Sequence, residues 1–313
     1  MDTINVTLIE PKLKHPTIFN KFDEIGENES FIIHNDHDPK PLYYQLIAER
    51  GQTFEWEYLL NGPEIWEVKI SKLTAGEKPK TVGEMVLEDY RKAEVFRKFG
   101  IDFCCGGKKT LQQACEKKGI NPNEVQSALE NLNTNSTQTE NYHSWSLDFL
   151  ADYIVNKHHT YVKESHSILF DLSQKVARVH GDKHPELIEI AHLYEEIANE
   201  LQMHMHKEEM ILFPYIKKLV LASKNEIPFE QAPFGSIVNP INMMESEHEL
   251  AGEHLEKIHE YSNNYTPPAD ACNSYRVLFA KLSEYEKDLH QHIHLENNLL
   301  FPKAIELEKS LNQ

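Results

Sequence analysis

The spacing of apolar positions divides the chain into three regions, and the first mixes strands with helices. Alternating apolar residues predict strands, whereas an apolar residue every three or four positions predicts helices. We expect strands over residues 30–34, 54–59 and 65–70, and helices over residues 15–25 and 41–49. The sequence Asn61-Gly-Pro between the last two strands predicts a hairpin. Residues 1–72 are therefore predicted to form a small α/β domain, followed by a polar linker over 71–80.

The second region, residues 79–133, has helical spacing throughout. Thr81 and Glu84 fit a helix-capping box, and an apolar stripe continues from there to Gly100, where the helix is expected to end. We expect three helices in this part of the chain, over residues 81–99, 110–119 and 123–132. A polar spacer is expected to follow over residues 133–140. This region is predicted to be a small helical domain.

The third region, residues 146–310, repeats the helical period over four long segments. The expected helices cover residues 147–179, 185–222, 239–261 and 270–307. Glycines and prolines gather in the breaks between them, and the longest loop is expected from about Ser223 to Pro240. Connections of this length favour antiparallel neighbours, so the region is predicted to be an up-down four-helix bundle. The whole chain is predicted to be multidomain and mainly α.

Charge and composition exclude several classes of partner. The net charge of −18 argues against nucleic acid and against an anionic membrane surface. No run of apolar residues reaches the ~18 that a membrane helix requires, and the first residues do not resemble a secretion signal. The four cysteines show no disulfide framework, which favours a reducing cytosol as the compartment. Fifteen of the 18 histidines lie at or after His143, which separates the third region from the others.

Within the third region, an eleven-residue segment beginning at His204 recurs 88 residues later at His292. Both copies have the pattern His-x-His-x-Glu and end in Leu-Phe-Pro. The first His of each copy is four residues before a Glu, Glu208 or Glu296, so on a helix the two side chains share one face. Two helices that each offer an imidazole and a carboxylate can hold metal between them.

Two further histidines continue the same spacing. His159 lies 45 residues before His204, His248 lies 44 residues after it, and His292 lies another 44 residues on. One His per helix plus loop is the spacing expected when each helix of an antiparallel bundle contributes one ligand at the same level. His158 could replace His159 as the ligand of the first helix, although His159 fits the spacing better.

Four histidines and two glutamates exceed the needs of one ion but suit two. Each ion would take about two histidines, and Glu208 and Glu296 would bridge the pair. An oxo or hydroxo bridge would then leave each ion roughly five-coordinate, with one position open. Imidazole and carboxylate without thiolate suit iron or manganese, with zinc also possible.

Helical phase separates these candidate ligands from their neighbours. His206 and His294 are two residues beyond a candidate ligand, so they should point roughly 200° away. His180 is 21 residues beyond His159, about 31 Å along a continuous helix, and should not bind the same ions. Glu200 and Glu247 lie close to candidate ligands, and each is a candidate ligand-orienting residue, a residue lining a path for iron, or a solvated charge.

The loop before the second helix of the small helical domain contains Cys104 and Cys105, followed by two glycines and two lysines. Glycines let the backbone expose the sulfurs, and the lysines with the next helix N-terminus should favour thiolate. We expect either a thiol relay for iron or electrons, or buried cysteines that act as ordinary apolar residues. Cys115 and Cys272 have no such neighbours and are expected to be structural.

Taken together, residues 79–308 resemble the di-iron iron–sulfur cluster repair proteins, the family named for repair of iron centres. The resemblance is carried by Phe103-Cys-Cys-Gly-Gly-Lys108, by Arg178-Val-His-Gly-Asp182, by Met244-Glu-Ser-Glu-His248 and by the two segments ending in Leu-Phe-Pro. It implies a hemerythrin-like bundle with a non-haem di-iron centre. The implied ligands are His159, His204, Glu208, His248, His292 and Glu296.

The resemblance also implies a function, namely repair of iron–sulfur clusters damaged by nitric oxide or peroxide, with damaged or apo iron–sulfur proteins as partners. Residues 1–72 depart from the usual two-domain member. They are similar to an uncharacterised α/β domain in the segments that begin at Asn35 and Phe54.

Three functions remain open at this point. The first is donation of iron from the di-iron site to damaged clusters. The second is a hemerythrin-type module that binds or senses O₂ or nitric oxide, and the third is an enzyme that reduces nitric oxide or peroxide. The two adjacent cysteines favour the first, because a carrier of O₂ needs no thiols. Whether the chain is an enzyme, and whether it forms a homodimer, stays open.

Overall fold

The computed structural model describes residues 2–51, 53–74, 79–132 and 142–312. The chain divides into two compact units, Met1–Thr139 and Glu140–Gln313, which are described separately. Part of the expected linker over 71–80 and the whole expected spacer over 133–140 fall outside the described residues. None of the described helices is both long and apolar enough to cross a membrane.

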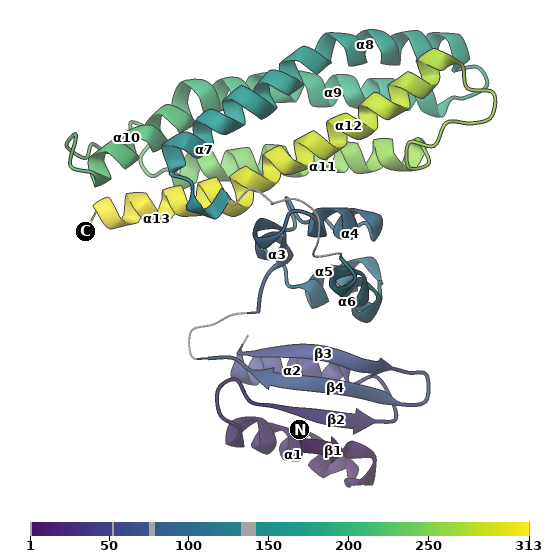
Figure 1. Ribbon diagram of the computed structural model, residues 1–313, viewed down its shortest axis with the longest axis vertical. Helices are drawn as coiled ribbons and strands as arrows, with labels where there is room; N and C mark the ends of the chain where they lie inside the picture. The colour runs from purple at the N-terminus through teal and green to yellow at the C-terminus, as the bar shows by residue number, and fades with distance from the viewer. Residues whose placement is uncertain (1, 52, 75–78, 133–141, 313) are drawn as a thin grey trace. The chain divides into compact units, whose positions relative to one another are not determined.

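The first unit begins with a four-stranded sheet and two helices (Figure 1). Its elements are β1 (Asp2–Asn5), η1 (Val6–Leu8), α1 (Pro11–Glu24), β2 (Ser30–Asn35), α2 (Lys40–Arg50), β3 (Phe54–Asn61) and β4 (Trp66–Lys72). The strand order is β1-β2-β4-β3, with β1 parallel to β2 and the other pairs antiparallel. The predicted hairpin is confirmed as β3 and β4, with an irregularity between Tyr58 and Leu60.

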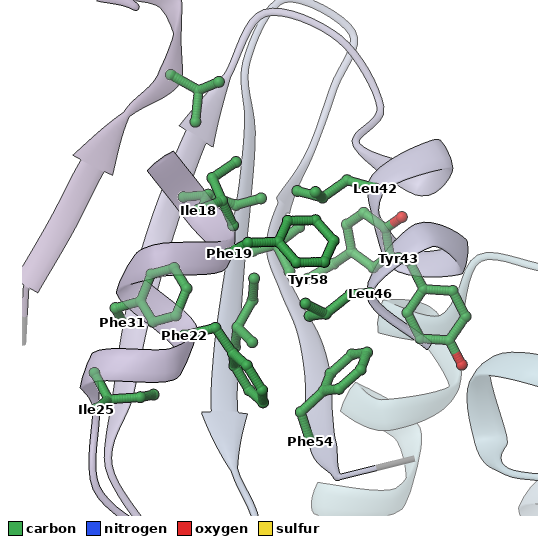
Figure 2. Packing of buried hydrophobic residues seen from close by; sticks show 14 residues of the cluster. Ile18, Phe19, Phe22, Ile25, Phe31, Leu42, Tyr43, Leu46, Phe54 and Tyr58 are labelled. Atoms are coloured by element: carbon green, nitrogen blue, oxygen red, sulfur yellow. The ribbon is translucent and has the colours of Figure 1, made fainter. Parts of the chain in front are cut away.

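Both helices pack on the same face of this sheet, as Figure 2 shows. Alternate residues of β2 and β4 are fully buried, which is the period of two that places one side of a strand in a core. The side chains that meet there include Ile18, Phe19 and Phe22 of α1, Leu42, Tyr43 and Leu46 of α2, and Phe31, Phe54 and Tyr58 of the strands. This core is separate from that of the bundle.

Two features of this domain differ from the prediction. Strand β1 was not predicted, because Asp2, Thr3 and Asn5 give it a polar sequence with one large apolar residue. Helix α1 begins at Pro11, four residues before the expected start, since Pro is well suited to the first position of a helix.

In the rest of the first unit, the described residues form four short helices, α3 (Val82–Glu88), α4 (Lys92–Lys98), α5 (Leu111–Lys118) and α6 (Pro122–Glu130). The predicted capping box of Thr81 and Glu84 is confirmed, and Thr110 with Gln113 forms a second one. The prediction of one helix from 81 to 99 was wrong. Asp89 adopts an extended backbone and accepts a hydrogen bond from the Arg91 amide, so the helix stops there and restarts.

The second unit is the predicted four-helix bundle (Figure 1). Its elements are η2 (Tyr142–Ser144), α7 (Leu147–Tyr153), η3 (Ile154–His159), α8 (Thr160–His180), α9 (Glu186–Lys207), η4 (Glu208–Leu212), α10 (Phe213–Ser223), α11 (Val238–Tyr261), α12 (Asn273–Leu295), η5 (Glu296–Leu300) and α13 (Phe301–Leu311). Helix α9 packs against α8 and α11, and α12 packs against α8.

The sequence predicted four uniform long helices. Three of them are interrupted. Segments η3, η4 and η5 are turns of π-helix, in which the backbone bonds to the residue five positions back. Each interrupts an otherwise continuous helix, so the first, second and fourth helices of the bundle each consist of two α-helical parts.

Candidate metal centre

The candidate ligands lie on the same stripes that build the bundle core. On α9 the buried residues Ile190, Tyr194, Ile197 and Leu201 recur every three or four positions, and the same spacing continues to His204. On α12 the corresponding stripe runs through Leu282, Tyr285 and Leu289 to His292. The sequence therefore places polar ligands at positions that helical phase directs into the apolar interior.

The structure brings the six predicted ligands together in two overlapping groups. One group is His159, Glu208, His292 and Glu296, and the other is His204, Glu208, His248 and Glu296. Within each group the ligand atoms lie within 4.8 Å of one another, and all six side chains are buried. Both glutamates belong to both groups, which is the arrangement expected of carboxylates that lie between two ions.

The ring nitrogens Nε2 face the carboxylates. His159 Nε2 lies 3.4 Å and His204 Nε2 lies 3.3 Å from Glu208 Oε2. His248 Nε2 lies 3.2 Å from Glu296 Oε2, and His292 Nε2 lies 3.1 Å from Glu296 Oε1. Each glutamate therefore contacts one His of its own helix and one His of another.

On three of the rings the opposite nitrogen, Nδ1, donates to an oxygen. These hydrogen bonds join His159 to Glu209, His204 to Glu247 and His248 to Asn297, each at 2.8 Å. A proton fixed on Nδ1 leaves the Nε2 lone pair directed at the cluster, which is how neighbouring groups prepare a His to bind metal. Of the two candidate neighbours proposed from sequence, Glu247 takes this role. Glu200 is exposed and lies outside both groups.

Two orienting residues were missed from the sequence, although the repeat contains the signal. Glu209 and Asn297 are each the residue after a shared glutamate, and each holds the His of a neighbouring helix. The same repeat supplies an aromatic cover. Phe213 stacks on His159 and Phe301 stacks on His248, with ring centroids 5.8 and 6.2 Å apart.

The π-turns explain how the glutamate and the phenylalanine of one repeat can both contact the same histidine. Phe213 donates its backbone N–H to the carbonyl of Glu208, and Phe301 donates to Glu296, in each case five residues back. In an α-helix, residues five apart point about 140° away from each other. The wider π-turn brings Glu208 and Phe213 to one side, so that both reach His159.

Charge in this buried site is balanced between carboxylates and imidazoles. Burial lowers the pKa of His204, but Glu208, Glu247 and Glu296 outweigh burial and raise it to about 10. Burial also opposes the charge on His292, yet Glu296 and Glu208 raise its pKa. The two carboxylates are therefore the source of the negative charge that raises the pKa of His204 and His292.

The buried polar atoms fit a bound cation. Among the described residues, His159 Nε2, both carboxylate oxygens of Glu208 and Oε2 of Glu296 are buried without a hydrogen-bond partner. A buried polar atom left unsatisfied costs roughly 1–3 kcal/mol, so several of them at one point need a reason. Two cations between the carboxylates and the imidazoles would satisfy them together, with donors that suit iron.

The remaining histidines lie outside the two groups. His206 is exposed, whereas His294 is buried and its Nδ1 lies 3.1 Å from the Asn298 amide nitrogen. His180 contacts Cys272, with Nε2 3.2 Å from Sγ. His158 is also buried, but its Nδ1 bonds to Asp288 and its ring stacks on His292. Of His158 and His159, between which the sequence left the choice open, only His159 belongs to one of the two groups.

The Cys104 thiol does not have the lowered pKa expected from the sequence. The contact with Cys105, burial and the nearby Asp102 raise the pKa of Cys104 well above its ordinary value. The prediction from the lysines failed for Cys104 because this residue is only 4% exposed and its sulfur faces a carboxylate. Cys115 is buried, as expected of a structural cysteine, and Cys272 is exposed.

Comparison with known proteins finds three families along the chain. Residues 3–72 match an uncharacterized conserved protein (DUF2249), residues 78–133 match a domain of unknown function (DUF542), and residues 151–304 match the hemerythrin HHE cation binding domain. The iron-sulfur cluster repair protein YtfE of Musicola paradisiaca is 39% identical over 72% of this chain and 96% of its own length. The chain belongs to the YtfE family. The YtfE proteins of Pectobacterium atrosepticum and Yersinia pseudotuberculosis are 37% and 36% identical, with the same coverage of both chains.

Membership of the YtfE family agrees with the geometry of the bundle. The cation binding domain spans the six buried side chains, and their two overlapping groups fit a di-iron site. Less than three quarters of this chain matches almost the whole length of the YtfE relatives. The α/β domain matches a family of its own, so it is an addition to the YtfE arrangement.

Proposed function

We propose that this protein repairs damaged iron–sulfur clusters by delivering iron from the bundle. The relatives that it matches over nearly their whole length bear the name of iron–sulfur cluster repair proteins. The observation that carries the proposal is the pair of buried groups that share Glu208 and Glu296. When bound there, iron would supply the ions that a damaged cluster has lost.

The proposed ligand set follows the two groups. His159 and His292 would serve one ion, His204 and His248 the other, and the shared glutamates both. Two histidines per ion hold iron less firmly than a set of thiolates would, which suits an ion that must later be released.

Residues around the ligands have two further tasks. The carboxylates of Glu209 and Glu247 keep the protons of His159 and His204 on Nδ1, and each carboxylate also pairs with a lysine, Lys163 or Lys207. Because the two carboxylates are only partly buried, they connect the ligands to solvent and could carry protons in or out as iron leaves. The stacked phenylalanines exclude water from the opposite side of the rings.

The partners of the bundle are part of the same proposal. We propose that apo or damaged iron–sulfur proteins receive the iron, that the Cys104–Cys105 loop takes part in the transfer, and that nitric oxide or O₂ can reach the open positions of the iron. The four cysteines are all free thiols, which supports a reducing cytoplasm as the place of action.

The direct test uses the full chain loaded with iron and an iron–sulfur protein stripped of its cluster. With sulfide and a thiol reductant present, we expect the visible absorption of the cluster to return as the repair protein loses iron. A variant with both Glu208→Gln and Glu296→Gln should lack bound iron and restore no cluster. Failure of the loaded wild-type protein to restore any cluster would contradict the proposal.

The same preparation separates the two other functions. A gas-binding module would show reversible changes of its iron absorption with nitric oxide or O₂ and no cluster return. A reductase would consume nitric oxide over many turnovers in the presence of an electron donor, with its iron retained.

A further inference from the structure

The Cys-Cys loop is organised around one carboxylate. Asp102 Oδ1 accepts hydrogen bonds from the backbone amides of Cys104 and Cys105, at 2.9 and 3.0 Å, and Oδ2 accepts one from Gly106 at 2.7 Å. The thiol of Cys104 also lies 3.1 Å from Oδ1. The loop thus folds back over the Asp102 side chain and places both sulfurs beside it.

The distance between the two sulfurs suits a single ion. Cys104 Sγ and Cys105 Sγ lie 3.9 Å apart. Two sulfurs bound at about 2.3 Å to one tetrahedral ion are separated by roughly 3.8 Å. A ligand oxygen of Asp102 completes a group of three donor atoms that all lie within 4.8 Å of one another.

The surrounding structure holds these donors in place without a ligand. Ile101, Phe103 and Cys104 are buried and anchor the loop in the core of the helical domain. Gly106 is required for the fold of the loop, because a Cβ at this position would lie 2.7 Å from the Asp102 carbonyl oxygen. The amide of Gly83 donates to the Gly107 carbonyl and ties the far side of the loop to α3. A site whose donors are already positioned loses little entropy when it binds.

We propose that Asp102, Cys104 and Cys105 bind one divalent, thiophilic cation, which is ferrous iron when the protein works. This deepens the proposed function, on which the identity of the ion as iron rests, and it adds a binding site in a different unit from the bundle. Binding forms two metal–sulfur bonds and one metal–oxygen bond, while the two thiol protons pass to solvent. No electron is transferred in this step.

Three donors rather than four make the site suited to exchange. Structural sites for such ions are usually closed by four protein ligands, whereas sites that react or pass ligands keep one position open. Asp102 is exposed and Cys105 is half-buried, so the open position faces solvent. Two thiolates and a carboxylate carry three negative charges, of which one divalent ion balances two.

The test is a titration of the full chain with Co²⁺ under reducing, oxygen-free conditions, after loading with two equivalents of iron for the bundle and removal of loosely held iron by a chelator, so that the loop starts empty. Thiolate ligands give Co²⁺ an intense sulfur-to-metal charge-transfer absorption that imidazole and carboxylate ligands do not give. We expect about one equivalent of Co²⁺ per chain to produce this absorption, matching the one cysteine-containing group among the described residues. Absence of the absorption at saturating Co²⁺ would overturn the proposal.

Three variants assign the signal to the loop. Cys105→Ser should weaken Co²⁺ binding at least about tenfold, the size of effect that even a supporting residue has on a metal site. Asp102→Asn keeps the acceptor for the amides of Cys104 and Cys105 and loses the one for Gly106, so Co²⁺ affinity should fall, with circular dichroism as the check on the fold. Cys272→Ser, an exposed cysteine of the other unit, is the matched control and should change nothing. Unchanged binding in Cys105→Ser, with circular dichroism like the wild type, would contradict the site.

The cobalt titration and the repair assay can fail independently. A chain that binds Co²⁺ through Cys105 but restores no cluster would retain the metal site and lose the proposed function. A chain that restores clusters but shows no cobalt–thiolate absorption would retain the function and lose this site.

Discussion

At the scale of single residues, the most informative positions are those that follow the shared glutamates. Glu209 is charged and pairs with Lys163, whereas Asn297 is neutral, yet each accepts a hydrogen bond from the Nδ1 of a ligand on another helix. His159 and His204 therefore have carboxylates behind them, and His248 has an amide. Because a carboxylate makes the ring a stronger base, the four histidines are not equivalent as ligands.

A first prediction separates ligands from neighbouring histidines. His204→Ala should reduce the iron content from about two per chain to about one, because His204 belongs to one buried group, and Glu296→Ala should reduce it below one, because Glu296 belongs to both. His206→Ala should keep its iron, since that side chain is exposed. Metal analysis of the purified variants measures this. Loss of iron from His206→Ala but not from His204→Ala would show that the helical register is wrong.

A second prediction concerns Glu209. Glu209→Gln keeps an oxygen that can accept from His159 Nδ1, whereas Glu209→Leu removes it. We expect the leucine variant to bind iron about 10–100-fold more weakly and the glutamine variant to be affected less. Competition with a chelator of known affinity measures the difference. Equal affinities in the two variants would mean that the hydrogen bond does not orient the ring.

At the scale of elements, the three π-turns coincide with the ligands. Segment η3 ends at His159, η4 begins at Glu208 and η5 begins at Glu296. A π-turn holds one residue more than an α-turn, so the helices before and after it stay in phase while the turn itself widens. Pro214 and Pro302 lie two residues beyond the ends of η4 and η5, at positions where a regular helix would require an amide N–H.

The extra residue in η4 can be tested by comparing two single-residue deletions, one inside the π-turn and one inside the α-helix before it. Removal of Met210 from η4, together with Pro214→Ala, should convert the π-turn into an α-turn and leave both flanking helices in phase. Removal of Met203 from α9 in the same Pro214→Ala background should rotate everything beyond it by about 100°. The two methionines are similarly exposed, at 64% and 63%, so they form a matched pair. We expect helix content and melting temperature to be nearly kept in the first variant and clearly reduced in the second.

Circular dichroism and thermal melting read out this comparison. Proline replacement is included because a proline forced into a regular helix costs about 3 kcal/mol on its own. Equal destabilisation by the two deletions would show that η4 does not absorb a residue.

The sequence allowed the bundle and the six clustered side chains to be predicted because both depend on spacing within the chain. Steps of 44 or 45 residues place one His per helix at one level, and a Glu four residues on shares its face. The π-turns, the stacking of Phe213 on His159 and the contact with Glu209 depend on register between helices, which one sequence does not reveal. The raised pKa of Cys104 was missed for a similar reason, since Asp102 and burial act only once the loop has folded.

At the scale of the whole molecule, the chain keeps its candidate chemistry in two places. The His and Glu groups lie in Glu140–Gln313, and the Cys-Cys loop lies in Met1–Thr139. The bundle ligands include no sulfur, so the loop is not needed to hold the bundle iron. Any dependence of repair on the loop must therefore arise at a later step than iron binding.

The corresponding prediction uses the double variant Cys104→Ser with Cys105→Ser. It should keep about two irons per chain in the bundle groups but restore clusters poorly, because the thiols would act in the transfer. Iron analysis and the cluster-return assay, run on the same preparation, measure the two properties. Full repair activity in the double variant would remove the thiols from the pathway and shift support to gas binding or gas reduction.

The distribution of donors between the two halves of the bundle has a consequence for its mechanics. The hairpin before the long loop supplies His159, His204 and Glu208, and the hairpin after it supplies the other three donors. Each group draws two donors from each hairpin, so every bound ion would be a cross-link between them. A ligand that binds only the folded state stabilises it by mass action. The bundle would thus become less rigid as it releases iron. Proteases or iron-donating partners could distinguish the iron-free protein from the iron-loaded protein by this difference in rigidity alone.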